Sequence, residues 1–421
     1  MEEIANTNID SSETHFLRRN FIGGLWHGAF LALGMSLTQP TTVISAFVAE
    51  LTGSTIWVGG LATVLTVAGA LPQLFVARWM NPIVFKKPYL LGAIYLRVLS
   101  WGTLAWLIYA TGGQQPILLA WILVGALVVF YAGGGIANIP FTDIVGKVIP
   151  PGKRGAFFGG RGALAAPLSI GAALAAREIL ARVAYPNNYA MLFGLAAVGL
   201  GIASLGFSVM KEPPSPIAGQ RIQPWREYWK QVAATSLRLK ELILAQLLTG
   251  FSLMALPFYV VYAREKLGAP ADAVGWYLLA QVLGGVIFNL LWARLVDRSG
   301  SRRMLFTCSI LSTATPLLAV GLRPLGWLAL LPVFFLAGAT FNGRVVGFQS
   351  ALLELAPAEE RGTYTGLNEA LILPVAFLPL AAGAFLEHWS YTALFWVAAL
   401  FIGAGAVIIF HWAKQTRRKN S

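Results

Sequence analysis

The chain alternates between long apolar stretches and short polar segments that hold most of its charge. Residues 242–263 and 273–293 contain no Asp, Glu, Lys or Arg, and residues 98–142 are free of them for 45 positions. The polar turn at 111–116 (TGGQQP) divides this last stretch in two. Because a transmembrane helix needs about 20 apolar residues, the pattern predicts membrane-spanning helices throughout. We place twelve of them, at 21–49, 56–77, 88–110, 116–138, 159–183, 188–210, 240–263, 273–293, 304–323, 325–349, 364–386 and 391–413.

A polar segment rich in proline, at 211–223 (KEPPSPIAGQRIQ), separates the sixth predicted helix from the seventh. Such a composition is typical of a linker. It predicts two six-helix bundles, at 21–210 and 240–413, joined by a linker at 211–239. Polar tails at 1–20 and 414–421 complete the expected organisation. The predicted fold class is therefore an all-α membrane protein with 12 transmembrane helices.

The composition excludes an ordinary soluble enzyme. Hydrophobic residues make up 57% of the chain and charged residues only 12%, whereas a soluble domain has about 25% charged residues. The chain has one cysteine, Cys308, and four histidines without the spacing of a metal cluster. We therefore expect no disulfide, no metal site, no cofactor and no enzymatic activity.

The net charge of +13 raises the question of nucleic-acid binding. Of the 31 Lys and Arg residues, however, 24 lie in the tails and loops on the side of both termini and the linker, and five lie in the opposite loops. Basic residues accumulate on the cytoplasmic side of a membrane protein. We therefore expect both termini and the linker in the cytoplasm, at a bacterial inner membrane, and no nucleic-acid partner.

The two predicted bundles repeat one another. At an offset of 216, residues 58–59 match 274–275, 77–78 match 293–294, and the basic pair at 86–87 matches the basic pair at 302–303. At an offset of 207, residues 149–167 and 356–374 share seven identities, and Pro40 and Pro257 interrupt the first and seventh helices at an offset of 217. An internal duplication of this kind predicts two parallel bundles that rock about a site between them.

The most specific local motif is the sequence 293–303 (ARLVDRSGSRR) between the eighth and ninth helices. With this motif and the duplication, the chain resembles the major facilitator superfamily of secondary transporters over essentially its whole length. The family motif has a small residue, three others, Asp, Arg, any residue, Gly and a basic pair. Ala293 and Ser301 depart from it, and Asn81 stands at the aspartate position of the copy between the second and third helices.

The resemblance implies which loop charges work a gate. In the family, the eighth helix borders the fifth and the second borders the eleventh, so we expect Asp297 to pair with Arg161 or Arg154, and Arg78 with Glu369. The alternative is that these charges are solvated and serve topology only. Glu369 is also a candidate for proton coupling, because an embedded carboxyl group is costly unless it is paired or protonated. The gate and coupling candidates are Arg78, Arg154, Arg161, Asp297, Arg298, Gly300, Arg302, Arg303, Arg361 and Glu369.

Polar residues inside the predicted helices are candidates for the substrate path. The resemblance implies that the first, fourth, seventh and tenth helices line the cavity, with the second, fifth, eighth and eleventh beside them. The proline next to Gln39 frees a backbone carbonyl that either binds substrate or is satisfied within the kink. The cavity candidates are Gln39, Asn138, Gln246, Tyr259, Gln281, Asn289, Asn342 and Arg344.

Three further embedded residues have competing interpretations. Arg344 either binds an anionic substrate through its fork, pairs with Glu354, or extends to the membrane surface. Arg97 lies on the third helix, which the resemblance makes peripheral, so a structural pairing is expected there. His27, beside an aromatic residue on the first helix, is expected to be a packing residue rather than a titrating group.

These features together favour a transporter. We expect a secondary active transporter that moves a small organic solute by alternating access, as a functional monomer in the lipid bilayer, with proton coupling left open. The alternative within the class is a drug or metabolite efflux antiporter, for which Gly162, Pro167 and Gly171 on the fifth helix give weak support. Outside the class, the alternative is a membrane receptor or scaffold that does not transport.

Overall fold

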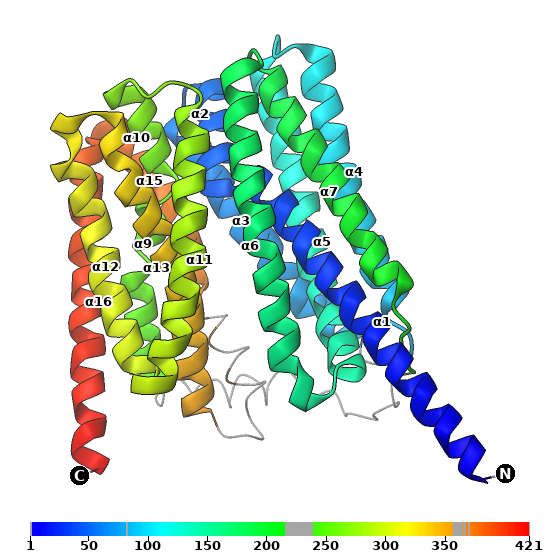
Figure 1. Ribbon diagram of the computed structural model, residues 1–421. Coiled ribbons are helices and arrows are strands. Elements are labelled where there is room, and N and C mark those ends of the chain that lie inside the picture. The colour runs from blue at the N-terminus through cyan, green and yellow to red at the C-terminus, as the bar shows by residue number, and fades with distance from the viewer. Residues whose placement is uncertain are drawn as a thin grey trace. The chain divides into compact units, whose positions relative to one another are not determined.

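The computed structural model describes residues 2–80, 83–214, 239–356, 364, 368 and 371–420. The regular elements among these residues are helices (Figure 1). By its internal contacts the chain divides into two compact units. Unit 1 comprises Met1–Gln39 and Val64–Arg221, and unit 2 comprises Pro40–Thr63 and Ile222–Ser421. The segment Pro40–Thr63, predicted from the sequence as part of the first bundle, thus packs with the second half of the chain.

The described helices of unit 1 are α1 (Glu2–Leu37), the later part of α3 (Thr55–Met80), α4 (Lys87–Thr111), α5 (Pro116–Val148), α6 (Pro151–Arg182) and α7 (Asn187–Val209). Proline lies in the first turn of α4, α5 and α6, where its missing N–H costs nothing and its fixed φ favours a helix start. Gly112 ends α4 with φ +56, a conformation that favours glycine.

The helices of unit 1 pack closely because small residues lie at their crossings. Helix α1 packs against α6 and α7, and α4 packs against α5 and α7. Where α1 meets α7, a Cβ on Gly23 or Gly206 would overlap the carbonyl oxygen of the other. The fully buried ring of Trp101 lies 4.5 Å from that of Phe130 and 5.0 Å from that of Phe193, centroid to centroid. These contacts form a rigid interior in which polar groups must find partners.

Unit 2 begins with η1 (Pro40–Ile44), α2 (Ser45–Thr52) and the start of α3. Residues 239–249 are helical and are followed by α9 (Ser252–Ala255) and α10 (Phe258–Leu267). The remaining helices are α11 (Ala273–Ser299), α12 (Ser301–Gly321), η2 (Arg323–Leu325), η3 (Trp327–Leu330), α13 (Leu331–Leu355), η5 (Leu373–Phe377), α15 (Leu378–His388) and α16 (Tyr391–Asn420).

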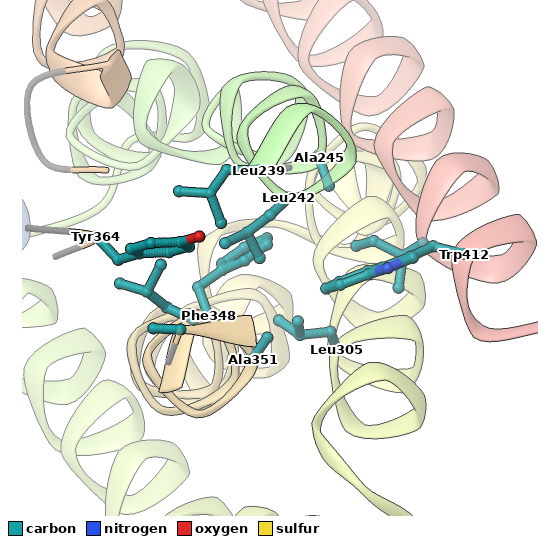
Figure 2. Packing of buried hydrophobic residues seen from close by; sticks show 11 residues of the cluster. Leu239, Leu242, Ala245, Leu305, Phe348, Ala351, Tyr364 and Trp412 are labelled. Carbon is teal, nitrogen blue, oxygen red and sulfur yellow. The ribbon is translucent and has the colours of Figure 1, made fainter. Parts of the chain in front are cut away.

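The core of unit 2 has two parts. Helices α11 and α13 cross so closely that a Cβ on Gly284 would overlap the carbonyl oxygen of Phe335. Towards the C-terminal end of α13, Phe348 packs with Leu242, Leu305 and other buried side chains, as Figure 2 shows. This cluster joins helix 239–249 to α12, α13 and α16.

Among the described residues, eleven helical segments are long and apolar enough to cross a membrane, and Leu373–His388 is a shorter apolar one. They follow the order of the twelve predicted spans, so the all-α membrane fold is confirmed. The predicted breaks also occur: α1 ends at Leu37 just before Pro40, and Pro257 precedes α10. The fifth predicted span starts too late, because α6 begins at Pro151 rather than 159. Charged side chains end the apolar pattern there, although Lys and Arg are good helix formers.

Candidate functional site

A cavity of about 380 Å³ opens within unit 2 between helix 239–249, α13, Asn368 and Ile372. Its polar lining comes from Gln246, Arg344, Gln349 and Asn368. Gln246 Nε2 donates to Asn368 Oδ1 at 2.6 Å, and Asn368 Nδ2 donates back to Gln246 Oε1 at 3.3 Å. Both residues are buried, and each amide satisfies the other. Gln246 was a predicted cavity residue, and the structure gives it this partner.

Arg344 holds the broken seventh span together. Its Nη1 donates to the carbonyl oxygen of Thr249 at 2.7 Å and to Ser252 Oγ at 2.9 Å, and its Nη2 donates to the carbonyl oxygen of Gln246 at 3.4 Å. These carbonyls lie at the end of helix 239–249, where a cation is favourable. Glu354, a possible partner by sequence, instead accepts from the backbone N–H and the hydroxyl of Ser301. Arg344 therefore satisfies the backbone at the break.

A second cavity, of about 270 Å³, lies within unit 1 between α1, α4, α5 and α6. Its lining includes His27, Arg97, Asn138 and Arg161. Asn138 and Arg161 were predicted as a cavity residue and a gate residue, whereas Arg97 was expected to have a structural pairing. In the described part of the chain, neither arginine forms an ion pair with a carboxylate.

The segment Pro40–Thr63 is held by polar contacts to the other helices of unit 2. Gln281 Nε2 donates to Thr41 Oγ1 at 2.8 Å. Arg264 Nη1 forms an ion pair with Glu50 Oε2 at 2.6 Å. Together these contacts bind η1 and α2, which belong to the first half of the sequence, to α10 and α11 in the second half.

The same segment makes close backbone contacts with α15. Thr55 Oγ1 donates to the carbonyl oxygen of Gly383 at 2.9 Å. A Cβ on Gly59 would overlap the carbonyl oxygen of Pro379, and one on Gly383 would overlap that of Thr55. Such an approach is possible only because both positions lack a side chain.

A charged network lies in unit 1 where α4 begins and α5 and α7 end. Glu212 accepts from the backbone N–H groups of Lys86 at 2.9 Å and Lys87 at 2.7 Å, and from Lys147 Nζ at 3.0 Å. Lys86 also pairs with Asp143 at 3.0 Å. The Glu212 side chain is only 3% exposed, and it satisfies the free N–H groups at the start of α4. Glu354 makes the corresponding contact with Ser301 at the start of α12.

The sequence did not indicate Asp143, Glu212 and Asn368 as members of these clusters. A signal was present for two of them, since Asp143 and Glu212 are isolated acids at the ends of spans, four residues before Lys147 and directly after Lys211. Asn368 directly precedes the predicted Glu369 in the sequence.

Several other predicted residues take structural roles. Tyr259 is buried with its ring centroid 5.1 Å from that of Phe395. Arg154 donates to the carbonyl oxygens of Ile149 and Gly146 at the end of α5. Arg302 lies over the Trp412 ring at 4.4 Å. These contacts leave the three side chains engaged within their own units.

The remaining predicted residues differ in exposure. Asn289, Asp297, Arg298 and Arg303 are exposed, whereas Gln39 and Asn342 are half-buried. Gly300 has φ +79 and joins α11 to α12, a conformation that favours glycine. Arg78 lies in α3. The predicted residues Arg361 and Glu369 lie outside the described residues.

Comparison with known proteins gives a family match for the second half of the chain and a fold for nearly all of it. The sequence model of the Major Facilitator Superfamily matches residues 242–421. An uncharacterized protein of Mycobacterium tuberculosis is 25% identical over 371 residues, which cover 84% of this chain and 69% of that protein. The uncharacterized MFS-type transporter YuxJ of Bacillus subtilis is 30% identical over 169 residues, which cover 39% of this chain and 42% of YuxJ.

Solved structures share the fold over nearly the whole chain. A bacterial homologue of the iron transporter ferroportin, in its inward-facing state, matches with a TM-score of 0.70 at 15% identity, covering 95% of this chain and 99% of that one. The D-xylose-proton symporter matches with a TM-score of 0.66 at 16% identity, covering 93% and 96%. The apolar helices are those of an integral membrane protein, and the chain has the fold of these solved transporters. By sequence, the second half of the chain is similar to the Major Facilitator Superfamily.

Proposed function

We propose that this chain is a secondary active transporter that moves a small organic solute across the bacterial inner membrane by alternating access. The observation that carries the proposal is the attachment of Pro40–Thr63 to unit 2, while α1 and the later part of α3 belong to unit 1. One stretch of the first half of the sequence thus closes against the second half. Alternating access requires such a closure to form at one end and to open again.

The direction of the chain in the membrane follows from its basic residues. The excess of Lys and Arg on the side of both termini and the linker supports a cytoplasmic location for that side. The contacts of Pro40–Thr63 with α10, α11 and α15 then form an outer gate, defined here by the residue pairs Thr41–Gln281, Glu50–Arg264 and Thr55–Gly383. We propose that solute exchange with the outside requires this outer gate to open.

Reconstitution of the full chain into proteoliposomes tests transport. Vesicles are loaded with a mixed pool of unlabelled solutes, and uptake of the labelled pool is followed by mass spectrometry, with and without a pH gradient. A transporter accelerates uptake when the same solute is present on the opposite side. Binding without uptake would support the receptor or scaffold alternative. Uptake that is insensitive to solute on the opposite side would support a channel.

The direction of net transport and its coupling are tested in the same vesicles. Net accumulation in response to an inward proton gradient supports a proton-coupled permease, and net loss supports an efflux antiporter. The variant Glu369→Gln assigns the coupling residue: it makes uptake insensitive to the proton gradient if Glu369 carries the proton. Unaltered dependence on the gradient would exclude Glu369 from that role.

The gate charges predicted from the motif at 293–303 remain part of the proposal. Asp297 is exposed at the end of α11, where it is free to meet a basic partner when the cytoplasmic side closes. Neutralisation in Asp297→Asn should lower the uptake rate at unchanged protein abundance. Glu241→Gln, which neutralises an exposed carboxylate on helix 239–249, is the control and should leave the uptake rate unchanged. Equal uptake by Asp297→Asn and the unmodified chain would contradict the latch.

A further inference from the structure

In the described part of unit 1, two arginines face one cavity without a carboxylate partner. Arg97 comes from α4 and Arg161 from α6, and both line the cavity of about 270 Å³. Arg97 is only 9% exposed. Guanidinium groups remain charged under all physiological conditions, and a buried charge is costly unless it is paired. The described part of unit 1 thus holds two positive charges whose energetic cost a bound anion would reduce.

The contacts of Arg97 leave part of its hydrogen-bonding capacity unused. Its guanidinium lies over the Phe130 ring at 4.2 Å, and Nη2 contacts Met35 Sδ at 3.4 Å. A ring face and a thioether are weak partners for a cation. Among the described residues, the buried Nε of Arg97 has no acceptor. The fork of Arg97 is therefore available to a ligand.

Arg161 on α6 is also held by aromatic rings beside this cavity. Its guanidinium lies 4.8 Å from the centroid of the Phe141 ring and 5.9 Å from that of Phe157. Its buried Nη1 has no acceptor in the described part of the chain. Arg344 in unit 2 behaves differently, because its guanidinium donates to two backbone carbonyls and a hydroxyl. The described residues thus satisfy Arg344 with oxygen acceptors, whereas they offer Arg97 and Arg161 no carboxylate.

Glycines make the space that these arginines occupy. A Cβ on Gly133 would lie 3.0 Å from Arg97 Cγ, and a Cβ on Gly28 would lie 2.5 Å from Arg161 Nε. His27, next to Gly28 on α1, is 6% exposed, and its Nδ1 has no hydrogen-bond partner among the described residues. Four helices therefore contribute to this cavity, and its polar lining comes from His27, Arg97, Asn138 and Arg161.

We propose that this cavity binds an oxyanion group, a carboxylate or a phosphate, of the transported solute through Arg97 and Arg161. The inference rests on the proposed transport function, whose substrate class it names. Planar guanidinium forks match the geometry of carboxylate and phosphate oxygens. The exposed amide of Asn138, on the same cavity, supplies a donor for the uncharged part of the solute. The volume is near the lower end of ligand pockets, about 300–1,000 Å³, which suits a small organic anion.

The test measures binding separately from transport. The unfolding temperature of the purified full chain is measured in a detergent with a neutral headgroup, at one ionic strength. The oxyanions are succinate, glycerol 3-phosphate and inorganic phosphate, and the neutral analogues are succinamide and glycerol. We expect at least one oxyanion, and neither neutral analogue, to raise the unfolding temperature. Arg97→Gln and Arg161→Gln should each weaken that binding at least tenfold. Arg182→Gln, on the exposed end of the same helix as Arg161, should leave it unchanged.

A lysine variant and the ligand-free protein separate binding from a structural role. Arg97→Lys keeps the charge without the fork, so it should bind more tightly than Arg97→Gln and less tightly than the unmodified chain. Without ligand, Arg97→Gln should unfold at the same or a higher temperature, since it removes an unpaired buried charge. A lower unfolding temperature without any change in oxyanion affinity would overturn the proposal in favour of packing.

Two further outcomes overturn the proposal. The first is that no oxyanion stabilises the chain, or that each anion stabilises it no more than its neutral analogue does. The pairs compared are succinate with succinamide and glycerol 3-phosphate with glycerol. The second is that no soluble oxyanion binds, while phosphatidylglycerol in nanodiscs stabilises the chain and this stabilisation requires Arg97 and Arg161. That result would assign the site to a lipid headgroup. An oxyanion that binds through the two arginines but shows no exchange in vesicles supports the site and contradicts transport. Exchange that both variants leave unchanged supports transport and contradicts the site.

Discussion

The hydroxyl of Thr55 donates to the carbonyl oxygen of Gly383 at 2.9 Å, which joins the start of α3 to α15. The two residues are 328 positions apart in the sequence and come from opposite halves of the internal duplication. Near this bond the two backbones touch at Gly59 and Pro379. A side chain added at this contact should therefore disturb the outer gate.

Two adjacent glycines of α3 give a matched pair for that steric change. A Cβ on Gly59 would overlap the carbonyl oxygen of Pro379, whereas a Cβ on Gly60 would make an ordinary contact of 3.7 Å with Leu380. Overpacking costs about 1–3 kcal/mol, which shifts an equilibrium about five- to 150-fold. Gly59→Ala should therefore slow exchange in proteoliposomes by such a factor, and Gly60→Ala should not. Equal rates for both variants would show that the α3–α15 contact does not limit transport.

Glu212 should stabilise unit 1 more than its sequence position suggests. It accepts from two backbone N–H groups and from Lys147, with its side chain almost fully buried. Because removing one partner of a buried charge pair costs about 3–5 kcal/mol, Glu212→Gln should lower the unfolding temperature in detergent clearly. Glu178→Gln removes a carboxylate that is 43% exposed and pairs with Arg177 and Arg182. That control should cost less than about 1 kcal/mol. A reversed order of the two variants would refute the role of Glu212.

The break in the seventh span should require the guanidinium group of Arg344 and not only its positive charge. Arg344→Lys keeps the charge but cannot donate at once to the carbonyl of Thr249 and the hydroxyl of Ser252. Unsatisfied buried polar groups cost about 1–3 kcal/mol, so we expect a lower unfolding temperature. Arg298→Lys, an exposed position on α11, is the control and should unfold like the unmodified chain. Full stability of Arg344→Lys would show that charge suffices.

The crossing of α11 and α13 should tolerate no added methyl group. A Cβ on Gly338 would overlap the carbonyl oxygen of Gln281, whereas a Cβ on Gly92 of α4 would meet no atom within 4 Å. Gly338→Ala should therefore destabilise unit 2 by about 1–3 kcal/mol. Gly92→Ala should stabilise the chain by up to about 1 kcal/mol, because alanine is the better helix former. Thermal unfolding of both variants checks this, and a stable Gly338→Ala chain would contradict the close crossing.

The sequence predicts the fold well because the apolar pattern alone determines which segments span a membrane. The prolines at 40 and 257 predict the breaks in the first and seventh spans, since proline removes a helical hydrogen bond. The pattern does not show how each helix is rotated about its axis, and this rotation determines which side chains face a cavity. Arg97 was expected to be structurally paired on a peripheral helix, yet it faces a cavity with Arg161. The glycines at 28, 133 and 134, which make room for both side chains, became informative only once their neighbours in space were known.

Contacts between distant parts of the chain were equally hidden in the sequence. Glu50 and Arg264 form their ion pair across 214 positions, and Thr41 meets Gln281 across 240. Gln281 was predicted to lie beside the substrate path from its polarity, but its partner depends on the attachment of Pro40–Thr63 to unit 2. No local propensity reports such long-range packing. The side chains of this outer gate are therefore best tested directly.

Reversible cross-linking of the outer gate tests alternating access most directly. Glu50 and Arg264 are partly exposed, 26% and 23% for their side chains, and their charged atoms lie 2.6 Å apart. The double variant Glu50→Cys with Arg264→Cys is joined by a cleavable reagent that reacts with thiols, and the native Cys308 stays silent because it is buried. We predict that the cross-linked chain exchanges no solute in proteoliposomes and that cleavage of the link restores exchange. Undiminished exchange by the fully cross-linked chain would contradict transport by alternating access through this gate.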